Sequence, residues 1–146
     1  MANKTNPYKY PIRIDKDGRW FHEGSEIKRQ AMIKLFSSVL RKEDDGRYWL
    51  KTPAEEGLID VEDVPFIIID LSIEQSGRDR TVKLFTNLSE VAEVNAQNTI
   101  TMKGNIPYIH VRDNLEARIT RPVLLSLADL VEEDIEDMQT DQKYGF

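Results

Sequence analysis

The two histidines are the residues of this chain that could take part in acid–base chemistry most directly. His22 and His110 each fall on a predicted strand, near the carboxylates Glu23 and Glu116 respectively. If those two strands were neighbours, the imidazoles and a carboxylate could form an acid–base pair or bind a metal ion. The simpler interpretation is that they are two isolated histidines at half-exposed strand positions.

Three arginines form a second group with chemical potential. Arg112, Arg118 and Arg121 surround the last predicted hairpin and the start of the last predicted helix. Guanidinium groups beside a helix N-terminus would suit an anionic ligand. The alternative is that they form ion pairs with nearby carboxylates of the chain itself. Those carboxylates are Asp113, Glu116 and Asp129.

The common catalytic and cofactor-binding motifs are absent from the sequence. The seven glycines never occur as G-x-G, and there is no P-loop, H-E-x-x-H or G-x-S-x-G motif. Ser25–Lys28 matches only a bare S-x-x-K pattern, and Asp15–Gly18 resembles a calcium loop that has Trp20 where glycine is required. Cysteine is missing, which excludes thiolate and iron–sulfur chemistry. We therefore predict no catalytic residue, metal site or cofactor.

Composition and charge indicate a small folded protein of 146 residues, with one domain or two small lobes. The formal charge of -6 lies mostly in residues 132–146, which hold six acids and one lysine, so the body is nearly neutral. We interpret this tail as a solvated end; the alternative is an acidic docking segment. The charge argues against nucleic acid as a partner. No membrane span or secretory signal is evident, so a cytoplasmic location is expected.

The elements that position these side chains follow from the hydrophobic pattern. Residues 11–22 predict a hairpin with a type I′ turn at Asp17-Gly18, and residues 27–40 predict a helix capped by Ser25. A second helix is predicted from Pro122, with fraying after residue 131. Residues 87–98 are ambiguous. Further strands are predicted at residues 48–52, 58–61, 66–74, 81–86, 99–102, 108–111 and 115–119, with 66–74 central in its sheet.

The order of these elements predicts an α+β fold of two small lobes with mainly antiparallel sheets. Residues 11–40 and 107–131 both follow the order strand, turn, strand, helix, which suggests a repeated hairpin–helix motif. We expect an N-terminal lobe over residues 1–64 and a C-terminal lobe over residues 65–131. The acidic tail then covers residues 132–146.

Adjacent aromatic residues provide the clearest sign of an interface or pocket. Strand alternation places Trp20 and Phe21 on opposite faces of their strand, and likewise Tyr48 and Trp49. One member of each pair must therefore face away from the first helix. It would meet solvent, the second lobe or a partner.

Several sequence blocks resemble a bacterial family, domain of unknown function 1285. They are Asp-Gly-Arg-Trp-Phe (17–21), Leu-Phe-Ser-Ser-Val-Leu (35–40), Asp-Gly-Arg-Tyr (45–48), Thr-Pro (52–53), Val-Glu-Asp-Val-Pro-Phe (61–66), Thr-Asn (86–87) and Tyr-Ile-His-Val-Arg (108–112). The resemblance covers residues 10–131 and leaves the acidic tail outside. It implies a two-lobed α+β fold with repeated motifs, no established activity and a role in signal transduction or regulated ligand binding. It brings no catalytic residues with it.

These observations together predict a non-enzymatic regulatory module that binds a small anionic ligand or a protein partner between its lobes. Two alternatives stay open: an enzyme with a His/carboxylate site, and a structural subunit that forms a homodimer through outward aromatics. Ser37 and Ser38, in the first helix, could allow the lobes to pack closely. The candidate ligand-binding residues are Trp20, His22, Thr86, Asn87, Tyr108, His110, Arg112, Arg118 and Arg121.

Overall fold

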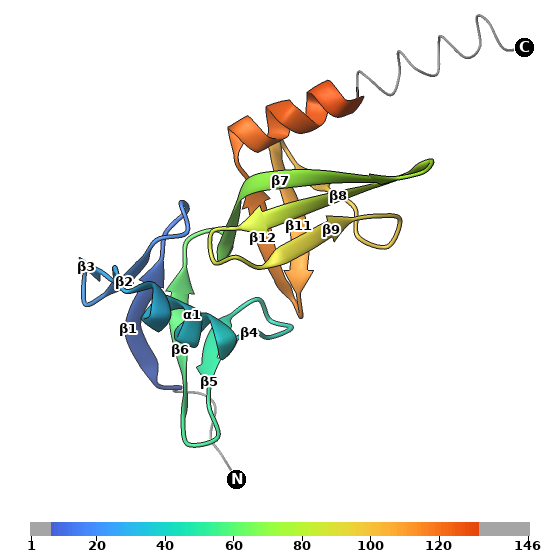
Figure 1. The fold of residues 1–146 in the computed structure, drawn as a ribbon. Coiled ribbons are helices and arrows are strands. Elements are labelled where there is room, and N and C mark those ends of the chain that lie inside the picture. The colour runs from blue at the N-terminus through green and yellow to red at the C-terminus, as the bar shows by residue number, and fades with distance from the viewer. Residues whose placement is uncertain (1–6, 132–146) are drawn as a thin grey trace, which may run out of the picture.

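Two six-stranded sheets build the two lobes of the chain (Figure 1). The computed structural model describes residues 7–131. The N-terminal lobe contains β1 (Lys9–Ile14), β2 (Trp20–His22), β3 (Ser25–Glu26), α1 (Gln30–Ser38), β4 (Leu40–Lys42), β5 (Tyr48–Lys51) and β6 (Glu56–Val61). The C-terminal lobe contains β7 (Phe66–Ser76), β8 (Asp79–Thr86), β9 (Val91–Val94), β10 (Thr101–Lys103), β11 (Ile106–Arg112) and β12 (Leu115–Ile119). A second helix follows, described over residues 121–131.

The predicted α+β fold with two mainly antiparallel lobes agrees with this structure. Each sheet has one parallel pair at its centre, β1 with β6 and β12 with β7, and all its other pairs are antiparallel. The strand order is β3-β2-β1-β6-β5-β4 in one sheet and β9-β8-β7-β12-β11-β10 in the other. The two orders are therefore equivalent, strand for strand.

The predicted hairpin–helix repeat is not confirmed. Residues 11–40 supply the first three strands of one sheet, whereas residues 107–131 supply the last two strands of the other. The order strand, turn, strand, helix recurs because it is a short local pattern, and here it occupies two different places in the topology. What the sheets share is the order of all six strands.

The first helix is shorter than its hydrophobic pattern predicts. It begins at Gln30 rather than Ile27, and Leu40 belongs to β4. Positive φ angles at Glu23 and Gly24 turn the chain back so that β3 pairs with β2, which delays the helix. Ser25 therefore lies in β3, and the residue at the N-cap position makes no side-chain capping bond.

The first hairpin turn also differs from the prediction. Only Gly18 has a positive φ, whereas a type I′ turn would require one at Asp17 as well. The Gly18 N–H donates to the carbonyl of Asp15. The Asp15 N–H donates to the carbonyl of Arg19 at 2.9 Å, which closes the turn. This is a type I turn followed by a left-handed glycine.

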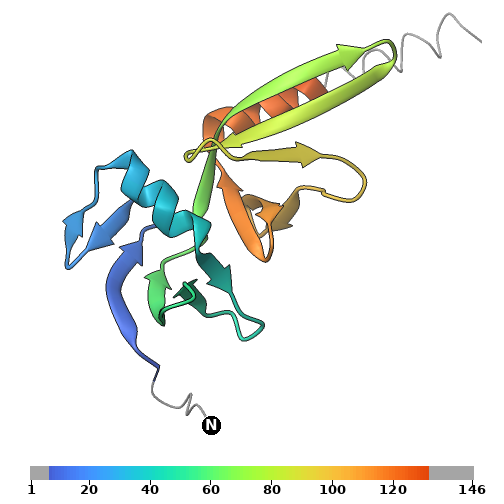
Figure 2. The same cartoon turned by 60° about the horizontal axis from the view of Figure 1, so that its bottom comes forward.

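A single hydrophobic core includes buried residues of both sheets. Trp20 stacks on Phe36 of α1, with ring centroids 6.1 Å apart, so α1 covers part of its own sheet. β7 lies at the centre of its sheet, as predicted, and the second helix contributes Val123 to the core beside the β7–β8 hairpin (Figure 2). The ambiguous segment 87–98 forms a turn, β9 and an isolated bridge.

The outward aromatics lie in different surroundings. Phe21 lies beneath the guanidinium of Arg13, and Trp49 is buried with Arg47 and Lys51 over its ring. Within residues 7–131 no helix is long and apolar enough to cross a membrane. The predicted fraying after residue 131 and the acidic tail lie outside the described residues.

Candidate functional site

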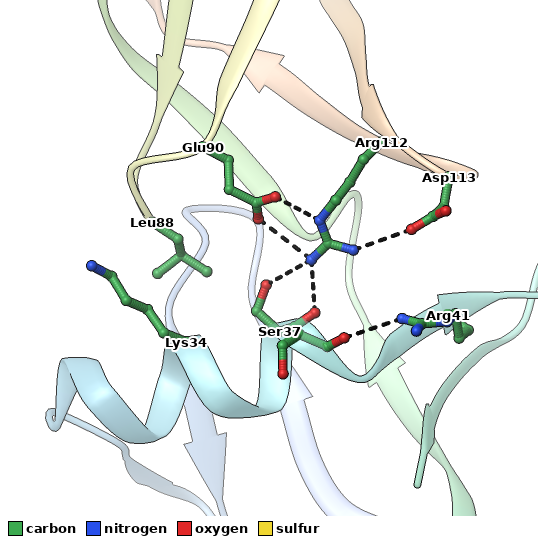
Figure 3. A pocket seen from close by; sticks show the side chains of 8 residues that line it. Lys34, Ser37, Arg41, Leu88, Glu90, Arg112 and Asp113 are labelled. Atoms are coloured by element: carbon green, nitrogen blue, oxygen red, sulfur yellow. Dashed lines mark hydrogen bonds and ion pairs between the residues drawn. The ribbon is translucent and has the colours of Figure 1, made fainter.

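A pocket of about 430 Å³ lies where the two lobes meet (Figure 3). The N-terminal lobe contributes the last turns of α1 and the start of β4 through Lys34, Ser37, Ser38 and Arg41. The C-terminal lobe contributes two loop edges through Leu88, Glu90, Arg112 and Asp113. We call this the inter-lobe pocket.

Arg112, at the end of β11, forms the wall that joins the two lobes. Its Nε donates to Glu90 Oε1 at 2.5 Å, and its Nη2 donates to Glu90 Oε2 at 3.4 Å. The same Nη2 donates across the interface to the carbonyl oxygen of Ser37 at 2.8 Å and to its hydroxyl at 3.2 Å. Asp113 accepts from Nη1, and the Phe66 ring lies 5.6 Å from the guanidinium carbon. Arg112 therefore links α1, the 86–90 turn and β11.

The end of α1 explains why a guanidinium fits here. The last carbonyls of a helix have no partner within the helix and carry partial negative charge. Ser37 is 3% exposed, and its carbonyl accepts from both Arg112 and the Val39 N–H. Arg41 donates to the carbonyls of Ser38 and Leu40. Two arginines thus satisfy carbonyls near the C-terminus of α1.

Glu90 is placed by a tight turn that begins at Thr86. The buried Thr86 hydroxyl accepts the backbone N–H groups of Leu88 at 3.2 Å and Glu90 at 3.0 Å. Ser89 takes a positive φ of 66° within the turn. Thr86 therefore positions the carboxylate that holds Arg112, although Thr86 does not itself line the inter-lobe pocket.

The charge of the inter-lobe pocket is unbalanced toward the positive side. Lys34, Arg41 and Arg112 outnumber the two carboxylates, Glu90 and Asp113. Lys34 is exposed, and no other residue among 7–131 forms a hydrogen bond or ion pair with its ammonium group. Among the described residues, Lys34 is therefore a cation of the pocket without an ion-pair partner. Arg41 is a second cation, and within residues 7–131 it is hydrogen-bonded only to carbonyl oxygens.

Three more of the predicted site residues also hold the lobes together. Asn87 donates to the Gly18 carbonyl at 3.3 Å, and Arg118 donates to the Lys16 carbonyl at 3.0 Å. The Tyr108 hydroxyl donates to Asp63, which lies between β6 and β7, at 3.0 Å. Burial and that hydrogen bond to Asp63 raise the pKa of Tyr108. These residues lie at the lobe interface but outside the inter-lobe pocket.

The remaining predicted site residues are dispersed. Trp20 is 1% exposed in the N-terminal core, and Arg121 is exposed at the start of the second helix, beside a separate cavity that Tyr108 and Arg118 also line. His22 and His110 are exposed on strands of different sheets, so they are not on neighbouring strands. His110 faces Glu116 across the β11–β12 pair. Within residues 7–131 no group of three or more metal-ligating side chains gathers.

Sequence reasoning did not identify most of the lining residues. Of the predicted ligand-binding set, only Arg112 lines the inter-lobe pocket, and Ser37 and Ser38, expected at a close lobe contact, line it too. Nothing in the sequence indicates that Lys34 and Arg41 line a pocket; the pattern places them only on the polar face of the predicted helix. Glu90 lies in the segment whose structure the pattern left ambiguous, so its pairing with Arg112 had no sequence signature.

The described chain is thus a protein of two equivalent six-stranded sheets with a charged pocket between them. The family model for the N-terminal domain of unknown function DUF1285 matches residues 4–64, and that for the C-terminal domain of DUF1285 matches residues 65–144. The chain belongs to the DUF1285 family. The second match reaches residue 144, so most of the acidic tail lies inside the family region, contrary to the expectation that it lies outside.

Two solved structures of the same family resemble the chain. A DUF1285 family protein from Silicibacter pomeroyi DSS-3 is 36% identical with a TM-score of 0.76, over 86% of this chain and 73% of that one. A DUF1285 family protein from Shewanella baltica OS155 is 22% identical with a TM-score of 0.67, over 82% of this chain and 91% of that one. The second likeness concerns the fold alone. No curated protein matches the chain.

Proposed function

We propose that this protein is a non-enzymatic regulatory module of the cytoplasm that binds a small anionic ligand in the inter-lobe pocket. The observation that carries this proposal is the position of Arg112. Its guanidinium lines the pocket and at the same time bonds to both lobes. A ligand that engages Arg112 therefore acts on the contact that holds the lobes in their arrangement.

The charges of the pocket favour an anion as the ligand. Lys34 and Arg41 stand at the pocket without carboxylate partners among residues 7–131, and they could bind an anionic group. The carboxylate of Glu90 already accepts hydrogen bonds from the Arg112 guanidinium, so it takes the position that a bound anion would have. A ligand carboxylate or phosphate would take the place of Glu90, and the 86–90 turn would be released.

Release of this turn would couple ligand binding to the lobe arrangement. The turn carries Glu90 on one side, and on the other it carries Asn87, which bonds to Gly18 of the N-terminal lobe. A ligand shifts the equilibrium between two arrangements only if it binds one of them better. Competition for Arg112 supplies that difference, because the ligand and Glu90 cannot both occupy the same donors.

The test is a binding screen of the full chain with inorganic pyrophosphate, citrate and adenosine monophosphate, followed by calorimetry. We expect at least one anion to bind saturably. Lys34→Gln and Arg41→Gln should each weaken it about tenfold, whereas Glu90→Gln should strengthen it because the internal competitor loses its charge. Arg29→Gln, on an exposed arginine outside the pocket, is the matched control and should bind as the unchanged chain does.

A second readout follows the lobes themselves. The chain has no cysteine, so Ala31→Cys on α1 and Ala96→Cys after β9 give two exposed sites for spin labels, one on each lobe. The distance distribution between the labels should change when the anion is added. Failure of all three anions to bind, or stronger binding by the Lys34 and Arg41 variants, would contradict the proposed function.

A further inference from the structure

A second cavity, of about 440 Å³, lies within the N-terminal lobe, away from the inter-lobe pocket. Its walls are mainly apolar and come from both the sheet and α1. The apolar residues that line it are Ile12, Ile27, Met32, Phe36, Val39 and Leu50. Ile12 and Leu50 are only 7% and 5% exposed, so the floor of this cavity is part of the core surface. Its volume falls within the range of small-molecule sites. We call it the N-lobe cavity.

In the N-terminal lobe, α1 is shorter than its sheet is wide. Nine helical residues span about 14 Å, whereas six paired strands spread over roughly 24 Å. The stack of Phe36 on Trp20 holds α1 over one part of the sheet. Beside this stack, Ile12 and Leu50 form the nearly buried floor of the N-lobe cavity. Met32, which is 38% exposed, lies at the helical wall of this space.

Gly57 leaves room for the ring of Tyr10, which lines the N-lobe cavity. A Cβ atom at this position would lie 2.6 Å from Cε2 and 2.7 Å from Cδ2 of the Tyr10 ring. The φ angle of Gly57 is outside the left-handed range, so the backbone itself does not require glycine here. Glycine instead lets the Tyr10 ring approach β6 closely. Any larger residue would push that ring away from the sheet.

The polar end of the N-lobe cavity carries negative charge. Four lining residues are polar or amphipathic: Tyr10, His22, Thr52 and Glu55. Glu55 is the carboxylate among them, and neither lysine nor arginine lines the cavity. Burial, followed by the charge of Glu55, raises the pKa of Tyr10. The cavity thus joins an apolar chamber to an anionic rim.

We propose that the N-lobe cavity is a binding site for a small amphiphilic amine, with its alkyl or aryl body against Ile12, Phe36 and Leu50 and its ammonium group at Glu55. Burial of the apolar body supplies the affinity. The charge-assisted hydrogen bond to the carboxylate supplies the selection for a cation. This site is distinct in place and in charge from the inter-lobe pocket, and its ligand is of the opposite sign.

The test uses three probes with one body and three end groups: 4-phenylbutylamine, 4-phenylbutanol and 4-phenylbutanoate. Each is titrated into the full chain and followed by amide chemical shifts. We expect the amine to bind at least five times more tightly than the carboxylate, with shifts at β1, β5 and α1. Glu55→Gln should abolish the preference. Glu56→Gln, on the neighbouring carboxylate outside the lining, is the matched control and should retain the preference.

Two variants test the location of the site. Gly57→Ala should displace the Tyr10 ring into the N-lobe cavity and weaken the amine about tenfold. Gly57→Ala could also destabilise β6, so a second variant is needed. Met32→Trp fills the cavity from the exposed side of α1, and it should weaken amine binding in a chain that still folds. Absence of amine binding, tighter binding of the carboxylate, or full binding by the folded Met32→Trp protein would overturn the proposal. None of these results depends on whether an anion binds between the lobes.

Discussion

The guanidinium of Arg112 donates to the backbone carbonyl of Ser37 at 2.8 Å, across 75 residues of sequence and across the boundary between the two lobes. Ser37 is nearly fully buried at the end of α1, and Arg112 ends β11. A charged side chain from one lobe therefore completes the helix terminus of the other. This contact acts together with the bonds of Asn87 to Gly18 and of Arg118 to Lys16 to hold the two lobes in their arrangement.

Substitution of Arg112 should weaken the whole molecule. Arg112→Ala leaves the carboxylate of Glu90 without its donor and removes one of the two donors to the carbonyl of Ser37, and we expect a loss of about 2 kcal/mol in the free energy of unfolding. Arg112→Lys should recover less than half of it, because an ammonium group cannot reproduce the forked contact. Urea denaturation measures both. Arg121→Ala, on an exposed arginine, is the control, and an equal loss there would refute this account of Arg112.

The fold was largely predictable from local patterns. Alternation and turn residues located most strands, because the burial of one face imposes a period of two regardless of topology. The length of α1 was not predictable. The apolar spacing from Ile27 to Leu40 fits a helix, but strand pairing between β3 and β2, and between β4 and β5, removes residues from both of its ends. Tertiary pairing outweighs the local preference at both ends.

The site was predictable only in part. The blocks around Thr86, Asn87 and Arg112 supplied candidate residues by position, and the structure places Asn87 and Arg112 in contacts between the lobes. Glu90, the partner of Arg112, is positioned by a turn. That turn depends on the Thr86 hydroxyl and on the positive φ angle of Ser89. No residue period encodes such a pairing. Contacts between distant segments require the register of both sheets, which a single sequence does not supply.

Acid should destabilise the protein partly through Asp15. Burial acts to raise the pKa of this carboxyl, but the N–H groups of Arg19 and Asp17, with the Arg19 side chain, lower it overall. Its stabilising effect is therefore complete above the unfolded pKa of 3.8 and is lost as the pH falls through the lower folded value. Asp15→Asn should cost about 2 kcal/mol at pH 7 and flatten the stability profile below pH 4.

A matched control for Asp15 lies in the second hairpin turn. Asp45 accepts from the Arg47 N–H and side chain in a similar way, but it is exposed. Chemical denaturation of Asp45→Asn at several pH values should show a clearly smaller effect than Asp15→Asn. Equal effects would mean that the burial of Asp15 is irrelevant to its contribution.

Alkaline pH should act through Tyr48. Burial, with the charges of Glu116 and Asp63, raises the pKa of Tyr48 to about 12. The unfolded chain ionises near pH 10, whereas the folded chain does so only near 12, so stability falls between these values. Tyr48→Phe should remove on the order of 2 kcal/mol of that fall. Tyr10 and Tyr108, whose pKa values are also raised, should leave a residual slope.

The measurement for Tyr48 is the free energy of unfolding from urea titrations between pH 8 and 12. Tyr8→Phe is the control, since Tyr8 is 63% exposed. That variant should retain the alkaline fall of the unchanged protein. A Tyr48→Phe protein with an unchanged slope would show that the hydroxyl of Tyr48 ionises as readily in the folded as in the unfolded chain.

Gly18 and Gly46 allow the lobe contact to be separated from backbone strain. Both glycines have positive φ, 77° and 89°, so alanine should cost about 1 kcal/mol at either position. A Cβ at Gly18 would also lie 2.9 Å from Asn87 Nδ2, whereas at Gly46 it meets nothing within 4 Å. Thermal or urea unfolding should therefore show a larger loss for Gly18→Ala than for Gly46→Ala.

The excess loss at Gly18 should come from its contact with Asn87, and a double-mutant cycle can show this. In an Asn87→Ala background the obstructing amide is gone, and so is its hydrogen bond to the Gly18 carbonyl. Gly18→Ala should then cost only as much as Gly46→Ala. If the excess persists in that background, the obstruction must come instead from Ile67, whose Cγ1 would lie 3.3 Å from the added Cβ. In either case the first hairpin turn of the N-terminal lobe is constrained by a residue of the other lobe.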